Sequence, residues 1–116
     1  MNKPLVFSEL IAKGYSSASI YFSGGGDEGG AEGMTLNKFN GETIEVNVYS
    51  ASDAEDESGL SREIIDALQE PIYDKFGEFN GEFSVWGNLI WDTATNKVYF
   101  DGNEENRIAE PFREEL

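Results

Sequence analysis

The sequence predicts an α+β domain in which helices pack on one side of a mainly antiparallel sheet. Two pairs of alternating apolar segments flank turn-forming residues, which is typical of β-hairpins. A segment with helical periodicity lies between the two pairs. The chain has 116 residues, of which 39% are hydrophobic, enough for one core. We therefore expect a single α+β domain over residues 1–116, with about five strands and two helices.

The first third of the chain predicts a helix, a strand and a glycine-rich connection. Residues 4–13 read as a short helix, with Pro4 in its first turn and Gly14 as its stop. Residues 17–23 alternate between apolar and polar and predict a strand. The glycine-rich segment 23–33 is then expected to be a mobile connection between strands.

The first hairpin is expected within residues 34–49, around Asn40 and Gly41. A two-residue loop would place the apolar residues of the two strands on opposite faces of the sheet. A three-residue loop instead pairs Leu36 with Ile44 and brings the apolar residues to one face. Because a slip of one residue flips every side chain, we predict the three-residue loop.

The middle of the chain predicts an acidic loop followed by a helix. Residues 50–59 are polar and acidic and read as a loop. Ser61 is a suitable N-cap for a helix that runs to about Gly77. Pro71 lies inside this helix and removes a backbone donor, so we expect a kink there or two short helices.

The second hairpin is expected from residues 82–92 and 97–101. Pairing Asp92 with Lys97 sets Leu89 opposite Phe100, which gives one consistent apolar face. Gly87 is placed to interrupt the first of these two strands.

Charge restricts the function classes. The chain has 23 acidic and 8 basic residues, for a net charge of −15, and residues 103–116 read as an acidic tail. Nucleic acids and anionic membranes repel such a chain, so a basic protein or a cation is the natural partner. Cysteine and histidine are both absent, which removes thiolate chemistry, the usual zinc ligands and the usual general base. We expect no catalytic residue, no cofactor and no enzymatic activity.

Four carboxylates, Glu63, Asp66, Glu70 and Asp74, are spaced three, four and four residues apart. On a helix this spacing puts them on one face, which we call the acidic stripe, opposite an apolar face. Like-charge neighbours cost only about 0.2–0.5 kcal/mol each, so an ordinary solvated helix face remains one interpretation. The other is an outward row of anions that replaces the phosphates of a nucleic acid.

The second interpretation is favoured by the lack of interleaved basic residues, because Arg62 and Lys75 are expected to lie off the stripe. Acidic residues immediately upstream extend the charge. Trp86 is expected on the sheet face opposite Leu89 and Phe100, where it either packs under a helix or, if that face is bare, is a candidate aromatic contact. The predicted partner-binding residues are Glu63, Asp66, Glu70, Asp74, Asp53, Glu55, Asp56, Glu57 and Trp86.

The glycine-rich segment offers an alternative function. No lysine follows its glycines, and Asp27, Glu28 and Glu32 would repel a phosphate, so it is not a phosphate-binding loop. The same carboxylates are oxygen ligands of the kind that calcium prefers, although their spacing matches no EF-hand. A calcium-dependent regulatory or binding module that uses Asp27 is therefore the alternative prediction.

The motif G-x-G-D-x-G is present as Gly24, Gly26, Asp27 and Gly29, and a late hairpin carries Gly87, Leu89, Ile90, Trp91 and Asp92. In these features the chain resembles a family of uncharacterised small domains from phages and proteobacteria, which implies an α+β fold. In size, charge and lack of catalytic residues it also resembles acidic phage proteins, the anti-CRISPR proteins and anti-restriction DNA mimics. This resemblance implies an inhibitor of a CRISPR effector complex, or of another basic nucleic-acid-binding protein, in the host cytoplasm.

Overall fold

The computed structural model describes residues 3–25, 28–76, 84–105 and 109–116. These residues form three helices and one six-stranded antiparallel sheet, which confirms the α+β class. The strand order is β3-β2-β1-β4-β5-β6. In chain order the elements are α1 (Lys3–Ala12), β1 (Tyr15–Gly25), β2 (Glu28–Lys38), β3 (Thr43–Val46), α2 (Ala51–Ser58), α3 (Arg62–Phe76), β4 (Ser84–Asp92), β5 (Lys97–Glu105) and β6 (Ala109–Glu115).

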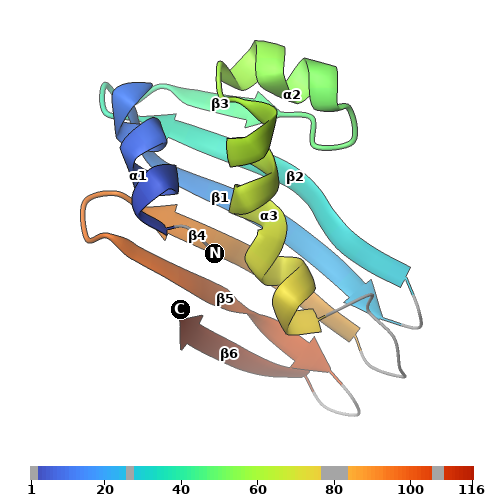
Figure 1. Ribbon diagram of the computed structural model, residues 1–116. Helices are drawn as coiled ribbons and strands as arrows, with labels where there is room; N and C mark the ends of the chain where they lie inside the picture. Colours follow the sequence, from blue (N-terminus) through green and yellow to red (C-terminus); the bar gives the residue numbers. More distant parts are fainter. Residues whose placement is uncertain (1–2, 26–27, 77–83, 106–108) are drawn as a thin grey trace.

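The helices and the sheet form two layers (Figure 1). Helices α1 and α3 lie across one face of the sheet, and α2 lies beside the edge strand β3. Among the described residues no helix covers the other face, which we call the open sheet face. No helix of the described part of the chain is long and apolar enough to cross a membrane.

The core lies between α3 and the middle strands. Ile64, Leu68 and Ile72 of α3 are buried against this layer, as their helical spacing predicts. The indole N–H of Trp91, in β4, donates to the backbone oxygen of Leu68 over 3.0 Å. A fully buried indole needs such a partner, so this bond fixes the position of α3 on the sheet. The ring of Phe22, in β1, makes an edge-to-face contact with the ring of Phe100, in β5.

Helix α3 begins where the sequence indicates. The backbone N–H of Ile64 donates to the side-chain oxygen of Ser61 over 3.4 Å, as expected of an N-cap. The helix runs without a break from Arg62 to Phe76 with Pro71 inside it, so the alternative of two short helices is wrong. Buried packing on both sides of Pro71 holds the helix together despite the missing donor.

Both hairpin registers are confirmed. Leu36 pairs with Ile44 in the first hairpin, and the three-residue loop ends at Gly41, which has a φ of 93°. In the second hairpin Leu89 pairs with Phe100. Gly87 does not interrupt β4, which contradicts that expectation. It lies opposite Gly102, and the two glycines let the backbones of β4 and β5 come unusually close.

The acidic segment expected as a loop is helix α2. Ser50 caps it by accepting from the backbone N–H of Asp53 over 3.4 Å. Gly59 ends it in the left-handed conformation, and its N–H donates to the backbone oxygen of Glu55 over 2.9 Å. Ala54 provides a buried contact on the inner side. The two caps and the buried Ala54 therefore stabilise a helix in a strongly polar segment.

The glycine-rich segment is not a loop along its whole length. Strand β1 continues to Gly25 and β2 begins at Glu28, and Ser23 pairs with Gly30 between them. The hydroxyl of Tyr73, in α3, accepts from the backbone N–H of Ala31 over 3.2 Å. A side chain at Gly30 would collide with this hydroxyl, which an added Cβ would approach to 2.7 Å. Glycine therefore lets α3 pack directly on the strand.

The predicted acidic tail contains strand β6, which pairs with β5 from Tyr99 and Glu115 onward. An edge strand tolerates Pro111, because only one side of its backbone takes part in the ladder. Ion pairs from neighbouring elements reach β6. Lys97 lies 3.7 Å from the carboxylate of Glu115, and Lys75 pairs with Glu114.

Tyr15 ties the start of the sheet to the end of α2. Its hydroxyl donates to the backbone oxygen of Ser58 over 2.5 Å, and its ring is buried. Burial raises the pKa of Tyr15 above 10.0, and the nearby charge of Lys38 lowers it by less. The folded state thus favours the neutral phenol.

We expect Tyr15→Phe to lose about 1 kcal/mol of unfolding free energy at neutral pH, because the hydrogen bond to Ser58 is lost. The stabilisation from neutral Tyr15 is complete below pH 10.0 and disappears as the pH rises through its raised pKa. Urea unfolding at neutral and alkaline pH should therefore show the gap between wild type and Tyr15→Phe closing above pH 10.0. A gap that stays constant would contradict this role of Tyr15.

Candidate protein-binding surface

The acidic stripe on α3 points to solvent, as the sequence predicts. Glu63, Asp66, Glu70 and Asp74 are all exposed. The opposite side of the helix supplies buried core residues, including Leu68. Because the apolar face is held against the sheet, the carboxylates are presented by a fixed support and do not depend on a loop.

Helix α2 extends the acidic surface. Asp53, Glu55, Asp56 and Glu57 are exposed, and α2 packs against α3. The carboxylate of Glu57 accepts a hydrogen bond from the backbone N–H of Asn47 over 3.1 Å. This bond connects α2 to the segment after β3. The structure therefore brings all eight predicted carboxylates onto two neighbouring helices. We call this surface the acidic helical layer.

The expectation that Arg62 lies off the acidic stripe is wrong. Its guanidinium Nε lies 3.9 Å from a carboxylate oxygen of Asp66, one turn further along α3. Both side chains are about two-thirds exposed, so the pair is weak and open to exchange. Lys75 pairs with Glu114 of β6, away from the stripe, as expected.

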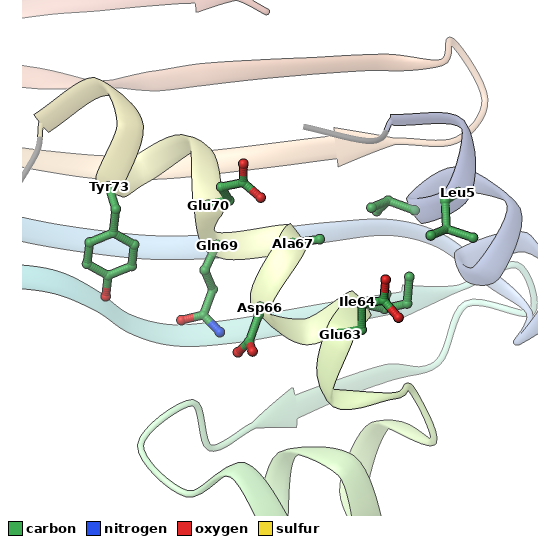
Figure 2. Close-up of a pocket in the computed structure, with 9 residues that line it drawn as sticks. Leu5, Glu63, Ile64, Asp66, Ala67, Gln69, Glu70 and Tyr73 are labelled. Atoms are coloured by element: carbon green, nitrogen blue, oxygen red, sulfur yellow. The ribbon is translucent and has the colours of Figure 1, made fainter.

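A shallow cavity of about 560 Å³ opens on the outer side of α3 next to α1 (Figure 2). Figure 2 shows the side chain of Ala67 pointing from α3 toward Leu5 of α1, whereas Asp66 points to the opposite side of α3. Leu5 is 40% exposed. The cavity, which we call the α1–α3 depression, is lined by Leu5, Val6, Glu63, Ile64, Asp66, Ala67, Gln69, Glu70 and Tyr73.

Sequence reasoning did not find the α1–α3 depression. Ala67 lies within the acidic stripe, and its small side chain leaves a gap between longer neighbours. A short residue among long carboxylates could have indicated a hollow, but the position of Leu5 depends on how α1 packs beside α3. That packing has no signature in either helix alone.

Trp86 does not belong to the acidic helical layer. It is half-buried on β4, pointing to the open sheet face together with Ile90 and Tyr99. Tyr21 of β1, on the same face, is 42% exposed, and the guanidinium of Arg113 lies 4.5 Å from the ring centre of Tyr99. The predicted partner-binding residues therefore divide between two faces of the molecule.

Of the three predicted calcium ligands, the structure describes the side chain of Glu32, whose exposed carboxylate accepts from the hydroxyl of Ser23 over 2.6 Å. Asp27 lies outside the described residues, as does the side chain of Glu28, whose backbone begins β2. Within the described part of the chain no group of three or more acidic side chains is arranged to hold a metal ion. The calcium alternative stays a prediction from the sequence.

The chain was compared with models of protein families, with curated proteins and with solved structures. None of the three comparisons found a match. The resemblance to small phage and proteobacterial domains therefore stays a prediction, and the function has to be argued from the surface itself.

Proposed function

We propose that this chain is a non-catalytic inhibitor that binds a basic nucleic-acid-binding protein and occupies the place of its nucleic acid. The observation that supports the proposal is the acidic helical layer, in which eight exposed carboxylates are carried by two helices that pack against each other. The target class that fits best is a host CRISPR effector complex or a nuclease that it recruits, met in the host cytoplasm.

The spacing of the charges supports this reading. The acidic stripe places a carboxylate about every 5 Å along α3, compared with about 3.4 Å per phosphate along one DNA strand. Lysine and arginine side chains are long enough to adapt to this difference. The net charge of −15 adds long-range attraction, which speeds the encounter with a basic cleft.

The helices that carry the carboxylates are held in place before the partner binds. Buried apolar residues and the Trp91–Leu68 hydrogen bond hold α3, and caps at both ends hold α2. A layer that is ordered before binding loses little conformational entropy when it binds. A disordered acidic tail with the same charge would bind less tightly.

The test is a competition assay in which this chain and duplex DNA compete for purified CRISPR effector complexes of several types. We expect displacement of DNA from at least one of them, with an apparent affinity that falls steeply as salt rises. If none of the complexes released its DNA even at low salt, the proposal would be contradicted. Displacement that is independent of salt, but lost on Trp86→Ala, would move the binding site to the open sheet face.

A further inference from the structure

The α1–α3 depression is lined by apolar side chains and by carboxylates. Its floor is apolar, from Leu5 and Val6 of α1 and Ile64 and Ala67 of α3. Three carboxylates of α3, Glu63, Asp66 and Glu70, also line it, and Figure 2 shows them leaving the helix in different directions. An acidic rim alone would attract any cation, and an apolar floor alone would attract any hydrophobic group. The combination selects for groups that have both properties.

Lysine and arginine side chains have both properties. Their methylene stems pack along apolar surface while the charged ends stay among water and anions. In the depression, stems would lie on Leu5 and Ala67, and the charged ends would reach Glu63 and Glu70. A phosphate, a sugar or a second copy of this acidic chain lacks that complementarity.

One carboxylate of the depression already has a cationic neighbour within the chain. The guanidinium of Arg62 rests 3.9 Å from Asp66, a residue that lines the depression. Since both side chains are largely exposed, an incoming arginine can take this place at small cost. Arg62 is therefore positioned to act as a weak internal competitor.

The size of the depression indicates more than one side chain. Its volume of about 560 Å³ lies in the range of about 300–1,000 Å³ that is typical of ligand sites and exceeds what one side chain fills. It also lies along two helices, where an amphipathic segment can lay down successive residues. A short stretch of protein with alternating basic and apolar residues fits this space best.

We infer that the α1–α3 depression is the specific anchor for a basic amphipathic segment of the partner protein, with apolar residues on Leu5 and Ala67 and lysine or arginine at the carboxylate rim. The inference rests on the proposed function and deepens it. The acidic helical layer supplies long-range attraction, and the depression determines which basic surface is held.

The probe for the test is a labelled helical peptide of arginine and leucine residues with one apolar face, titrated against the full chain by fluorescence anisotropy. Ala67→Phe fills part of the depression without changing charge and should weaken binding by about tenfold. Glu70→Gln should weaken it by about threefold. The matched control is Asp74→Asn, which removes the same charge from the same stripe outside the depression and should have about half that effect or less.

A second pair of variants tests the role of Arg62. Arg62→Gln and Lys97→Gln change the net charge equally, but only the first removes the competing cation, since Lys97 pairs with Glu115 of β6. We expect Arg62→Gln to bind the peptide about twofold to threefold more tightly than Lys97→Gln. Thermal melts of each variant establish that it is folded.

Equal weakening by Glu70→Gln and Asp74→Asn, with no effect of Ala67→Phe, would overturn the inference and leave only diffuse attraction. The proposed function would survive that result if the chain still displaced DNA from its target. Displacement of the peptide by spermine at equal charge concentration would also overturn it, because the depression would then accept small polyamines without needing an apolar face.

Discussion

Replacing Gly87 with alanine is expected to destabilise the fold by about 3 kcal/mol or more. A Cβ at this position would lie 2.4 Å from the Cα of Gly102 and 2.6 Å from the backbone oxygen of Asp101. These are backbone atoms in the middle of the sheet, so they cannot move aside as the end of a long side chain can. Gly87 also has a φ of +154°, which L-residues rarely adopt.

Urea unfolding followed by circular dichroism measures this change. Gly33→Ala is the matched control, because an added Cβ at Gly33, in strand β2 of the same sheet, would meet nothing within 4 Å. We expect Gly33→Ala to be neutral or slightly stabilising, since alanine reduces the freedom of the unfolded chain. If the two variants unfolded at the same urea concentration, the close approach of β4 and β5 would be disproved.

The combined variant Glu63→Lys, Glu70→Lys and Asp74→Lys is expected to reduce affinity for the basic partner by about a hundredfold or more at low salt. Each reversal removes an attraction of up to about 1 kcal/mol and adds a repulsion, and 1.4 kcal/mol corresponds to a factor of ten. The fold should survive, because all three side chains are exposed and the buried face of α3 is unchanged. The effect should shrink as salt rises.

The matched control reverses Glu42, Glu45 and Asp101, which are exposed residues outside the acidic helical layer. Both triple variants have the same net charge, so any difference between them comes from the location of the charges. The competition assay with duplex DNA measures both. Equal loss in the two variants would mean that only total charge matters, and the acidic stripe would then have no special role.

The registers of both hairpins could be predicted because each depends on local rules. The apolar residues of paired strands must share a face, and a one-residue slip violates this at every position. Leu36 opposite Ile44 and Leu89 opposite Phe100 both follow from that requirement alone. The solvent-facing position of the acidic stripe follows in the same way from the apolar face of α3.

Helix α2 and strand β6 could not be predicted because their sequences resemble solvated loops. Among the side chains of helix α2 that the structure describes, Ala54 is the one buried apolar residue, and the ends of the helix are defined by Ser50 and Gly59. The caps are visible in the sequence, but serine and glycine are equally common in turns. Strand β6 depends on pairing with β5, which no local pattern near Pro111 reveals.

The candidate site was predictable in its composition but not in its shape. The eight carboxylates were found because charge and helical spacing can be read directly. The α1–α3 depression is lined by Leu5 and Ala67 together, and these residues are distant in sequence. The separation of Trp86 from the carboxylates could not be predicted either, since it depends on which face of the sheet the helices cover.

The intrinsic fluorescence of the two tryptophans can report where a partner binds. Trp91 is sealed in the core, whereas Trp86 is half-buried on the open sheet face. Their indole emissions therefore arise in different surroundings, and a dissolved quencher such as acrylamide reaches Trp86 first. A partner docked on the helices would leave the quenching of Trp86 unchanged, and a partner that covers the open sheet face would suppress it. Fluorescence quenching therefore distinguishes binding to the two faces.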